Sequence, residues 1–137
     1  MNGEYVLSQD INASDTATWN GGAGFSPIGT NTQPFTGKIY GNGHVIRNLY
    51  INRPSQNNIG LIGYAGGGAE IKYLRVENAS IVGGNYVGIM VGYNNGGVIE
   101  DCHASGSVSG SQGVGGIVGE NRNIGTVIRI SSSATIS

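Results

Sequence analysis

Charged residues are scarce in this sequence, and the two signs nearly cancel. Only 11% of the 137 residues are charged, seven Lys and Arg against eight Asp and Glu, which gives a net charge of −1. A chain of this kind has no basic surface that would gather nucleic acid or an anionic membrane. The apolar runs are all short, so we expect no membrane insertion. No apolar stretch follows the first three residues, and no signal peptide is therefore recognised in this chain.

Cysteine, aromatic residues and helical periodicity are also in short supply. Cys102 is the single cysteine, so an internal disulfide bond is excluded. No window shows a convincing helical period, and β-branched residues fill most apolar positions, which favours strands. Glycine is abundant, with 26 residues and no Gly-X-Y period. The glycines therefore indicate many tight turns or close backbone contacts rather than collagen.

A pattern of three apolar residues recurs along the chain after 25, 28 and 28 residues. The four copies are Ile46/Leu49/Ile51, Ile71/Leu74/Val76, Ile99/Cys102/Ala104 and Val127/Ile130/Ser132. A period in this range predicts stacked repeats of one small unit, with the copies forming interior rows. The i, i+3 step breaks strict strand alternation, so the residue within each step is expected at a bend. These bend residues are Asn48, Tyr73, Asp101 and Arg129.

Each repeat carries three short strand candidates separated by Gly, Asn and Ser turns. This arrangement predicts an all-β fold, a parallel β-helix solenoid of about 4–5 coils with roughly 25–28 residues and three short strands per coil. We expect a single domain, with an irregular first coil or cap over residues 1–34 and coils over residues 35–137. Repeats are expected near 59–84, 86–111 and 113–137. Within the first coil, Ser14 or Asp15 is expected to cap a helical turn.

The glycine motifs carry a family resemblance. The runs IGLIG (59–63), VGIMVG (87–92) and VGGIVG (114–119) resemble the GLUG repeats of large bacterial secreted and surface proteins. The segment PFTGKIYGNGHVIRNLYI (34–51) is similar to the one that commonly precedes those repeats. The resemblance spans nearly the whole chain. It implies a right-handed β-helix from a haemagglutinin-like or adhesin-type protein, located outside the cell or on its surface.

Parallel β-helices include enzymes that cleave polysaccharides, and such enzymes need clustered acids or a metal site with a base on one strand face. The best local cluster is Glu100, Asp101, Cys102 and His103. Cross-strand ion pairs, Lys72 with Glu100 and Asp101 with Arg129, explain the two acids without catalysis. Cys102 lies in an apolar row and is expected to be a buried, unreactive thiol.

Three polar residues near the start of the chain resemble part of a calcium-binding loop. Asp10, Asn12 and Asp15 lack the full ligand set of a calcium loop. We therefore expect no catalytic, cofactor or metal site, and keep a carbohydrate-binding or carbohydrate-cleaving β-helix as the alternative.

Several side chains are candidates for a face that binds a glycan or a protein partner. Tyr64 and Tyr93 follow the glycine motif at equivalent positions, so they are expected on adjacent coils, where aromatic rings can stack on sugars. Tyr50, Arg75 and His103 are expected to form an outward row on another face.

The end of the sequence is a candidate interface. Thr135, Ile136 and Ser137 read as a strand without a polar cap. Because an open strand edge invites pairing, head-to-tail self-association or contact with neighbouring repeats of a longer chain is expected there. Together these features predict a non-enzymatic extracellular module with a structural or adhesive role, such as a segment of an adhesin, stalk or self-assembling filament.

Overall fold

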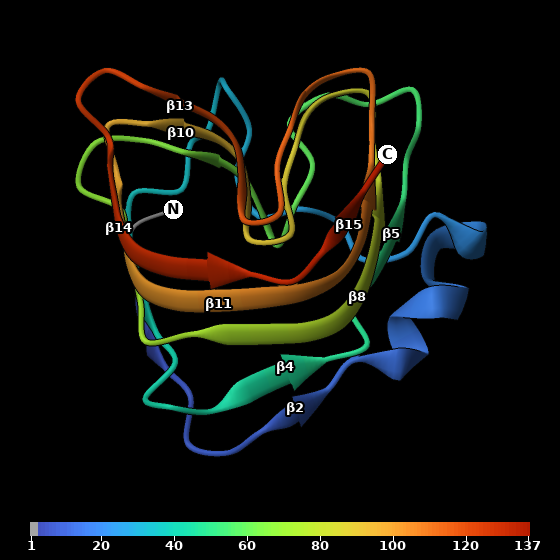
Figure 1. The fold of residues 1–137 in the computed structure, drawn as a ribbon, viewed down its shortest axis with the longest axis horizontal. Coiled ribbons are helices and arrows are strands. Elements are labelled where there is room, and N and C mark those ends of the chain that lie inside the picture. The colour runs from blue at the N-terminus through green and yellow to red at the C-terminus, as the bar shows by residue number, and fades with distance from the viewer. Residues whose placement is uncertain (1–2) are drawn as a thin grey trace.

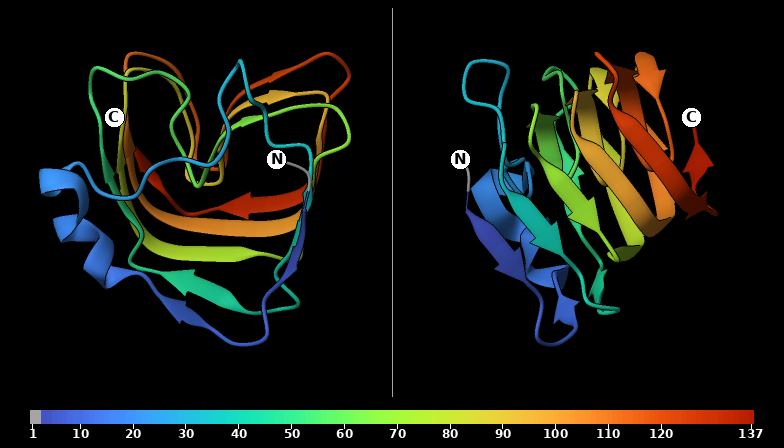
Figure 2. Two further views of the ribbon diagram at one scale, coloured as in Figure 1. Left: turned by 180° about the vertical axis from the view of Figure 1, so that it is seen from behind. Right: turned by 90° about the vertical axis from the view of Figure 1, so that its left-hand side faces the viewer.

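The computed structural model describes residues 3–137, which form a right-handed parallel β-helix. In Figure 1 the chain runs from left to right along the lower strands, rises on the right and returns across the top. The side view in Figure 2 shows that each turn is displaced along one axis, from the blue N-terminal coil to the red C-terminal one. The predicted fold class is therefore confirmed.

The strand register defines four coils and the beginning of a fifth. Glu4, Lys38, Glu70, Val98 and Thr126 follow one another in register, so successive coils take 34, 32, 28 and 28 residues. We call them coil 1 (4–37), coil 2 (38–69), coil 3 (70–97), coil 4 (98–125) and coil 5 (126–137). The last two steps match the predicted repeat length, and the first two coils are longer because they contain a helix and extended loops.

Most strands belong to one ten-stranded sheet that forms the floor and one side of the solenoid. Its strands are β1 (Glu4–Val6), β2 (Ile11–Asn12), β3 (Lys38–Tyr40), β4 (Val45–Arg47), β5 (Tyr50–Asn52), β7 (Glu70–Lys72), β8 (Arg75–Val82), β11 (Val98–Ser109), β14 (Thr126–Ser132) and β15 (Thr135–Ile136). A three-stranded sheet contains β6 (Ile62–Ala65), β10 (Val91–Asn95) and β13 (Val118–Arg122), and a two-stranded sheet contains β9 (Asn85–Val87) and β12 (Gln112–Val114). Every ladder between these strands is parallel.

Three of the four apolar triplets stack as predicted, whereas the first does not. The interior rows join Ile71 to Ile99 and Val127, and Cys102 to Ile130. The prediction that Ile46 lies in the row of Ile71 is wrong, because Ile39 occupies that place. Ile46 pairs instead with Val76, and Ile51 pairs with Ile81.

The first triplet is out of register because two different bends have the same backbone geometry. Asn48 and Tyr73 both have positive φ, 66° and 55°, so each interrupts its strand at the same point of the triplet. They belong to two different bends of the coil, since the Asn48 N–H bonds the Glu77 carbonyl and the Tyr73 N–H bonds the Glu100 carbonyl. The predicted bends with positive φ are confirmed. The apolar pattern is the same around both bends of the coil, so it does not distinguish one bend from the other.

The glycine motif lies where the chain folds into the middle of the coil. In Figure 1 the upper part of coils 3 and 4 descends toward the floor and climbs again before β10 and β13. The tips of this fold are buried, with Ile89 and Met90 fully enclosed. At Gly92 an added Cβ would lie 2.5 Å from the Ile59 nitrogen, and at Gly119 it would lie 2.5 Å from the Val87 nitrogen. The motif therefore contains glycine because the two walls approach through their backbones.

Asparagine side chains tie adjacent coils together at two corners. Asn94 is fully buried, and its Nδ2 donates to the Gly97 carbonyl at 3.0 Å and to Asn121 Oδ1 at 2.8 Å. At another corner Asn78 Nδ2 donates to Asn48 Oδ1, and Asn48 Nδ2 donates to Asn12 Oδ1. At the first corner Asn94 Oδ1 also accepts the Gly97 N–H, and at the second the side-chain amides bond one another from coil to coil. Sequence reasoning missed these asparagine ladders, although Asn recurs at these bends.

The expected helical turn in coil 1 is present as a 3-10 helix, η1 (Ser14–Gly22), which projects beside β5. Its predicted cap is wrong: Ala13 occupies the N-cap position, and the helix has no side-chain cap. Instead, Asn12 Oδ1 accepts the Ser14 N–H. The buried Thr16 fixes the helix to the solenoid by accepting the Tyr50 N–H at 3.0 Å.

Candidate functional site

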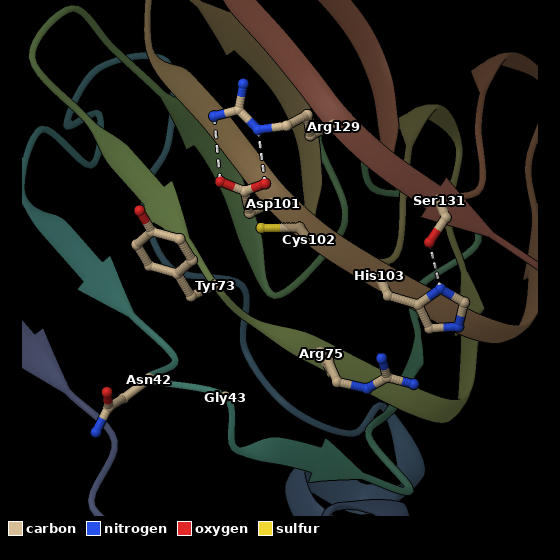
Figure 3. A pocket seen from close by; sticks show the side chains of 9 residues that line it. All are labelled: Asn42, Gly43, Tyr73, Arg75, Asp101, Cys102, His103, Arg129 and Ser131. Carbon is tan, nitrogen blue, oxygen red and sulfur yellow. Dashed lines mark hydrogen bonds and ion pairs between the residues drawn. The ribbon is translucent and has the colours of Figure 1, made fainter.

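An open groove crosses the outer face of the floor, with a volume of about 640 Å³. Its lining comes from coils 2 to 5: Asn42, Gly43, Tyr73, Arg75, Asp101, Cys102, His103, Arg129 and Ser131 (Figure 3). One row contains the bend residues Tyr73, Asp101 and Arg129. The other row contains Arg75, His103 and Ser131, which pair in register. The groove therefore runs along the solenoid axis rather than along one strand.

The bends form one wall of the groove by turning side chains outward. Tyr73, Asp101 and Arg129 have φ values of 55°, 54° and 49°. Such left-handed backbone is uncommon for Tyr and Arg and more usual for Asp, and its occurrence in three successive coils makes a continuous ridge. The ring of Tyr73 remains 51% exposed on this ridge.

The acids at the groove are already engaged in ion pairs. Arg129 Nε lies 2.7 Å from Asp101 Oδ1, and its Nη2 lies 3.2 Å from Asp101 Oδ2, so the pair is bidentate. Hydrogen bonding from Arg129 holds the pKa of Asp101 below its usual value. Arg129 also bonds Glu100, which in turn faces Lys72 at 3.9 Å. Both predicted cross-strand pairs, Lys72 with Glu100 and Asp101 with Arg129, are confirmed.

The second row of the groove combines cationic and hydroxyl groups. Arg75 donates two hydrogen bonds to Glu77 Oε2, at 3.0 and 2.8 Å, and these bonds lower the pKa of Glu77. His103 Nδ1 lies 2.6 Å from Ser131 Oγ in the next coil. The row thus offers hydrogen-bond donors and acceptors whose charge is largely compensated.

Cys102 forms the base of the groove and faces the interior. It is only 4% exposed, and its thiol donates to the Glu100 carbonyl at 3.2 Å. Burial raises the pKa of the thiol, which disfavours the reactive thiolate. The expectation of a buried thiol is confirmed.

An alternating charge row runs along the floor beside the groove. Lys38 Nζ lies 3.8 Å from Glu4 and 3.1 Å from Glu70, and Lys72 Nζ lies 3.0 Å from Glu70. Hydrogen bonds from Lys72 and then Lys38 lower the pKa of Glu70 to about 2. The row joins coils 1 to 4 through their outward side chains.

Among the predicted partner-face residues, the structure places Tyr64 and Tyr93 side by side. Their rings are parallel within 3°, with centroids 4.9 Å apart, and Tyr86 meets Tyr93 edge-on at 5.2 Å. Arg75 and His103 lie in the groove instead. Tyr50 pairs with Ser80, so its predicted place in the row of Arg75 and His103 is wrong.

The predicted end interface belongs to an open coil. Thr135 and Ile136 form β15, which pairs with β11, and the Ser137 N–H bonds the Val108 carbonyl at 3.0 Å. Ile136 remains 51% exposed. A shallow depression of about 460 Å³ lies on this end, and its lining includes Ile117, Val127 and Ile130. Whether this end is an interface stays a prediction.

Asp10, which could have contributed to a cation loop, has other partners. Asp10 accepts hydrogen bonds from the Val45 N–H and from Arg47, and it lies 3.2 Å from His44 Nδ1. The backbone and side-chain bonds to Asp10 lower its pKa, the Val45 N–H having the largest effect. Within residues 3–137, no group of three or more His, Cys, Asp or Glu side chains has the geometry to hold a metal ion.

Sequence reasoning identified only part of the groove. It named Arg75 and His103 as candidates, but assigned Tyr73 and Arg129 to bends and passed over Asn42 and Ser131. The signal that could have found the groove is the bend position itself, since three successive coils place Tyr, Asp and Arg where Asn or Gly would be easier. Within the described residues, no helix is long and apolar enough to cross a membrane.

Comparison with known proteins places this chain beside short segments of much longer ones. It is 46% identical over 116 residues to halomucin of Haloquadratum walsbyi, a match that covers 84% of this chain and 1% of halomucin. It is 39% identical over 105 residues to a putative Gly-rich membrane protein of Evansella cellulosilytica, covering 71% of this chain and 11% of that protein. No protein-family model matches the chain, so the GLUG resemblance stays a prediction. No solved structure matches it.

Proposed function

We propose that this chain is a non-enzymatic structural and adhesive block of a longer cell-surface solenoid. Both relatives contain the matching segment as a small part of a much longer protein, and one is named a membrane protein. Asp101, the acid that lines the groove, is paired with Arg129, and its lowered pKa makes it poorly suited to act as a general acid.

The distribution of exposed apolar residues carries this proposal. Of the nine large hydrophobic residues that are exposed within residues 3–137, four lie in coil 1 and four lie between Ile124 and Ile136. Those in coil 1 are Tyr5, Val6, Ile11 and Trp19. The others are Ile124, in the turn just before coil 5, and Ile128, Ile130 and Ile136 of coil 5. The solenoid thus concentrates its apolar surface at its two ends, where further coils would bury it.

The two open ends would also allow copies of the chain to stack head to tail through residues such as Ile136. Stacking of this kind is heterologous and has no built-in limit. Sedimentation velocity over a wide range of concentration tests this part, with Ile136→Lys expected to remove any growth in size. A monomer at every concentration contradicts self-association, but leaves the block within a longer chain intact.

Insertion of one more coil tests the proposal directly. Thr126 pairs with Val98, so a second copy of residues 98–125 placed after Gly125 continues the register. We expect a folded chain with a higher free energy of unfolding in urea, because each added repeat contributes another coil–coil interface. The matched control carries Ile99→Asp within the inserted copy, which places a charge in the interior and should remove the gain. A less stable or unfolded chain after the unmodified insertion would contradict the proposal.

A further inference from the structure

We propose that the groove on the floor binds an uncharged, hydroxyl-rich saccharide that lies along the solenoid axis. This inference rests on the adhesive role proposed above and names the ligand class of that role. Tyr73 is the starting point. It is the one large hydrophobic side chain within residues 3–137 that is exposed away from the two end regions. An exposed aromatic ring beside polar groups suits the apolar face of a sugar ring.

The bend position adds a second argument. In coil 2 the corresponding loop contains Asn42 and Gly43, residue types that adopt positive φ at little cost. Coils 3, 4 and 5 place Tyr73, Asp101 and Arg129 there. Asp tolerates this backbone, whereas Tyr and Arg each adopt it at a cost of order 1 kcal/mol. Asn at all three positions would hold the bend more easily. The side chains of Tyr73 and Arg129 therefore stand at positions where Asn would be easier, and both line the groove.

The polar groups match hydroxyls better than they match an anion. The Asp101–Arg129 pair presents acceptors and donors together in one planar array, and Ser131 beside His103 adds a hydroxyl and an imidazole (Figure 3). A sugar hydroxyl both donates and accepts, so it can use both kinds of group. The guanidinium groups already have carboxylate partners, Glu77 for Arg75 and Asp101 for Arg129. A polyanion would have to compete with those carboxylates.

The direction of the groove predicts the shape of the ligand. Four coils contribute to its lining. At a coil spacing of about 4.8 Å, the groove extends roughly 14 Å along the axis. Because equivalent positions recur on successive coils, a linear oligosaccharide finds contacts at regular intervals. Single sugars would use only part of this length.

The test uses the intact chain and neutral hexasaccharides as probes: cellohexaose, xylohexaose, mannohexaose and maltohexaose. Binding is followed by two-dimensional NMR of the backbone amides. We expect at least one probe to shift the amides around residues 73, 101 and 129. Tyr73→Asn keeps a residue that accepts the bend and removes the ring, and should weaken binding about tenfold. Binding should change little when salt is added, since ion pairing with the ligand is not its source.

The matched control is Ile124→Asn, which makes the same change at another positive-φ position, φ 55°, outside the groove. It should leave the affinity unchanged. Absence of binding to all four neutral probes overturns the inference. Polygalacturonate is tested beside them as an anionic probe, and binding to it alone that disappears in salt also overturns the inference. Equal loss of binding in the two variants also overturns it. Stability of the chain with an inserted coil is measured separately, so failure of the groove and failure of the solenoid block are distinguishable.

Discussion

Leu74, Cys102 and Ile130 occupy one interior row in three successive coils, yet their burial differs sharply. Leu74 is fully buried and Cys102 is 4% exposed, whereas Ile130 is 39% exposed. The three residues have the same place in the strand pattern, so sequence type does not explain the difference. Coils 3 and 4 have neighbours on both sides, and coil 5 has only one. In a solenoid, burial is therefore supplied by adjacent coils rather than by a common core.

The largest test of this comparison truncates the same row in the middle and at the end. Leu74→Ala should lower the free energy of unfolding by about 3 kcal/mol, because it opens a cavity among fully buried side chains. Ile130→Ala should cost about 1 kcal/mol, since the side chain already contacts solvent. Urea unfolding monitored by circular dichroism measures both. Equal losses in the two variants would mean that coil 5 is as well packed as coil 3.

The asparagine ladder offers a second comparison with a smaller expected effect. Asn94→Ala should destabilise the chain by about 2 kcal/mol, because the backbone N–H and carbonyl of Gly97 and the side-chain Oδ1 of Asn121 lose their partner. Asn121→Ala removes one amide at an exposed corner and should cost about half as much. The same unfolding measurement distinguishes them. If Asn121→Ala proved the more damaging change, the ladder would depend on its outer member.

The smallest expected effect concerns the row of alternating charges. Glu70 contacts both Lys38 and Lys72, whereas Glu4 lies in the first coil and has Lys38 as its neighbour in the row. Glu70 has a lysine on each side, and its pKa falls from 4.5 to about 2 in the folded chain. A lowered pKa contributes stability that is present above pH 4.5 and is lost as pH falls toward 2. Glu70→Gln should therefore be less stable than the parent chain at neutral pH, with the difference shrinking across that window.

Glu4 provides the control for this experiment. It faces only Lys38 among the lysines of the row, at 3.8 Å, and its side chain is 69% exposed. Glu4→Gln should change the unfolding free energy less at every pH, because exposed ion pairs contribute little. Unfolding midpoints in urea between pH 2 and pH 7 provide the measurement. A difference for Glu70→Gln that stays constant with pH would contradict the role of the two lysines.

Two components of the groove, its bends and its ion pairs, were predicted from the sequence, but the groove as a whole was not. The bends were anticipated from the i, i+3 step, and the ion pairs from charges one coil apart, since both are local or periodic features. The groove itself arises from the combination of two rows, Tyr73 to Arg129 and Arg75 to Ser131, which lie two residues apart on coils 3, 4 and 5. The prediction that Tyr50 lies in the second row is wrong, because the bend at Asn48 is not the bend that contains Tyr73. Register between coils decides such neighbours, and similar triplets at different bends leave it ambiguous.

The sequence by itself determined the fold class and the identity of most interior residues. Parallel strands, the 28-residue step of the later coils and the enclosed Cys102 all follow from periodic apolar residues, which report burial wherever the period is regular. Only the tertiary structure decided the register of the first two coils, the close backbone approach that explains the glycine motif, and the groove. Each of these depends on which residues lie one coil apart, about 4.8 Å away in space. The longer first coils shift that relation by several residues.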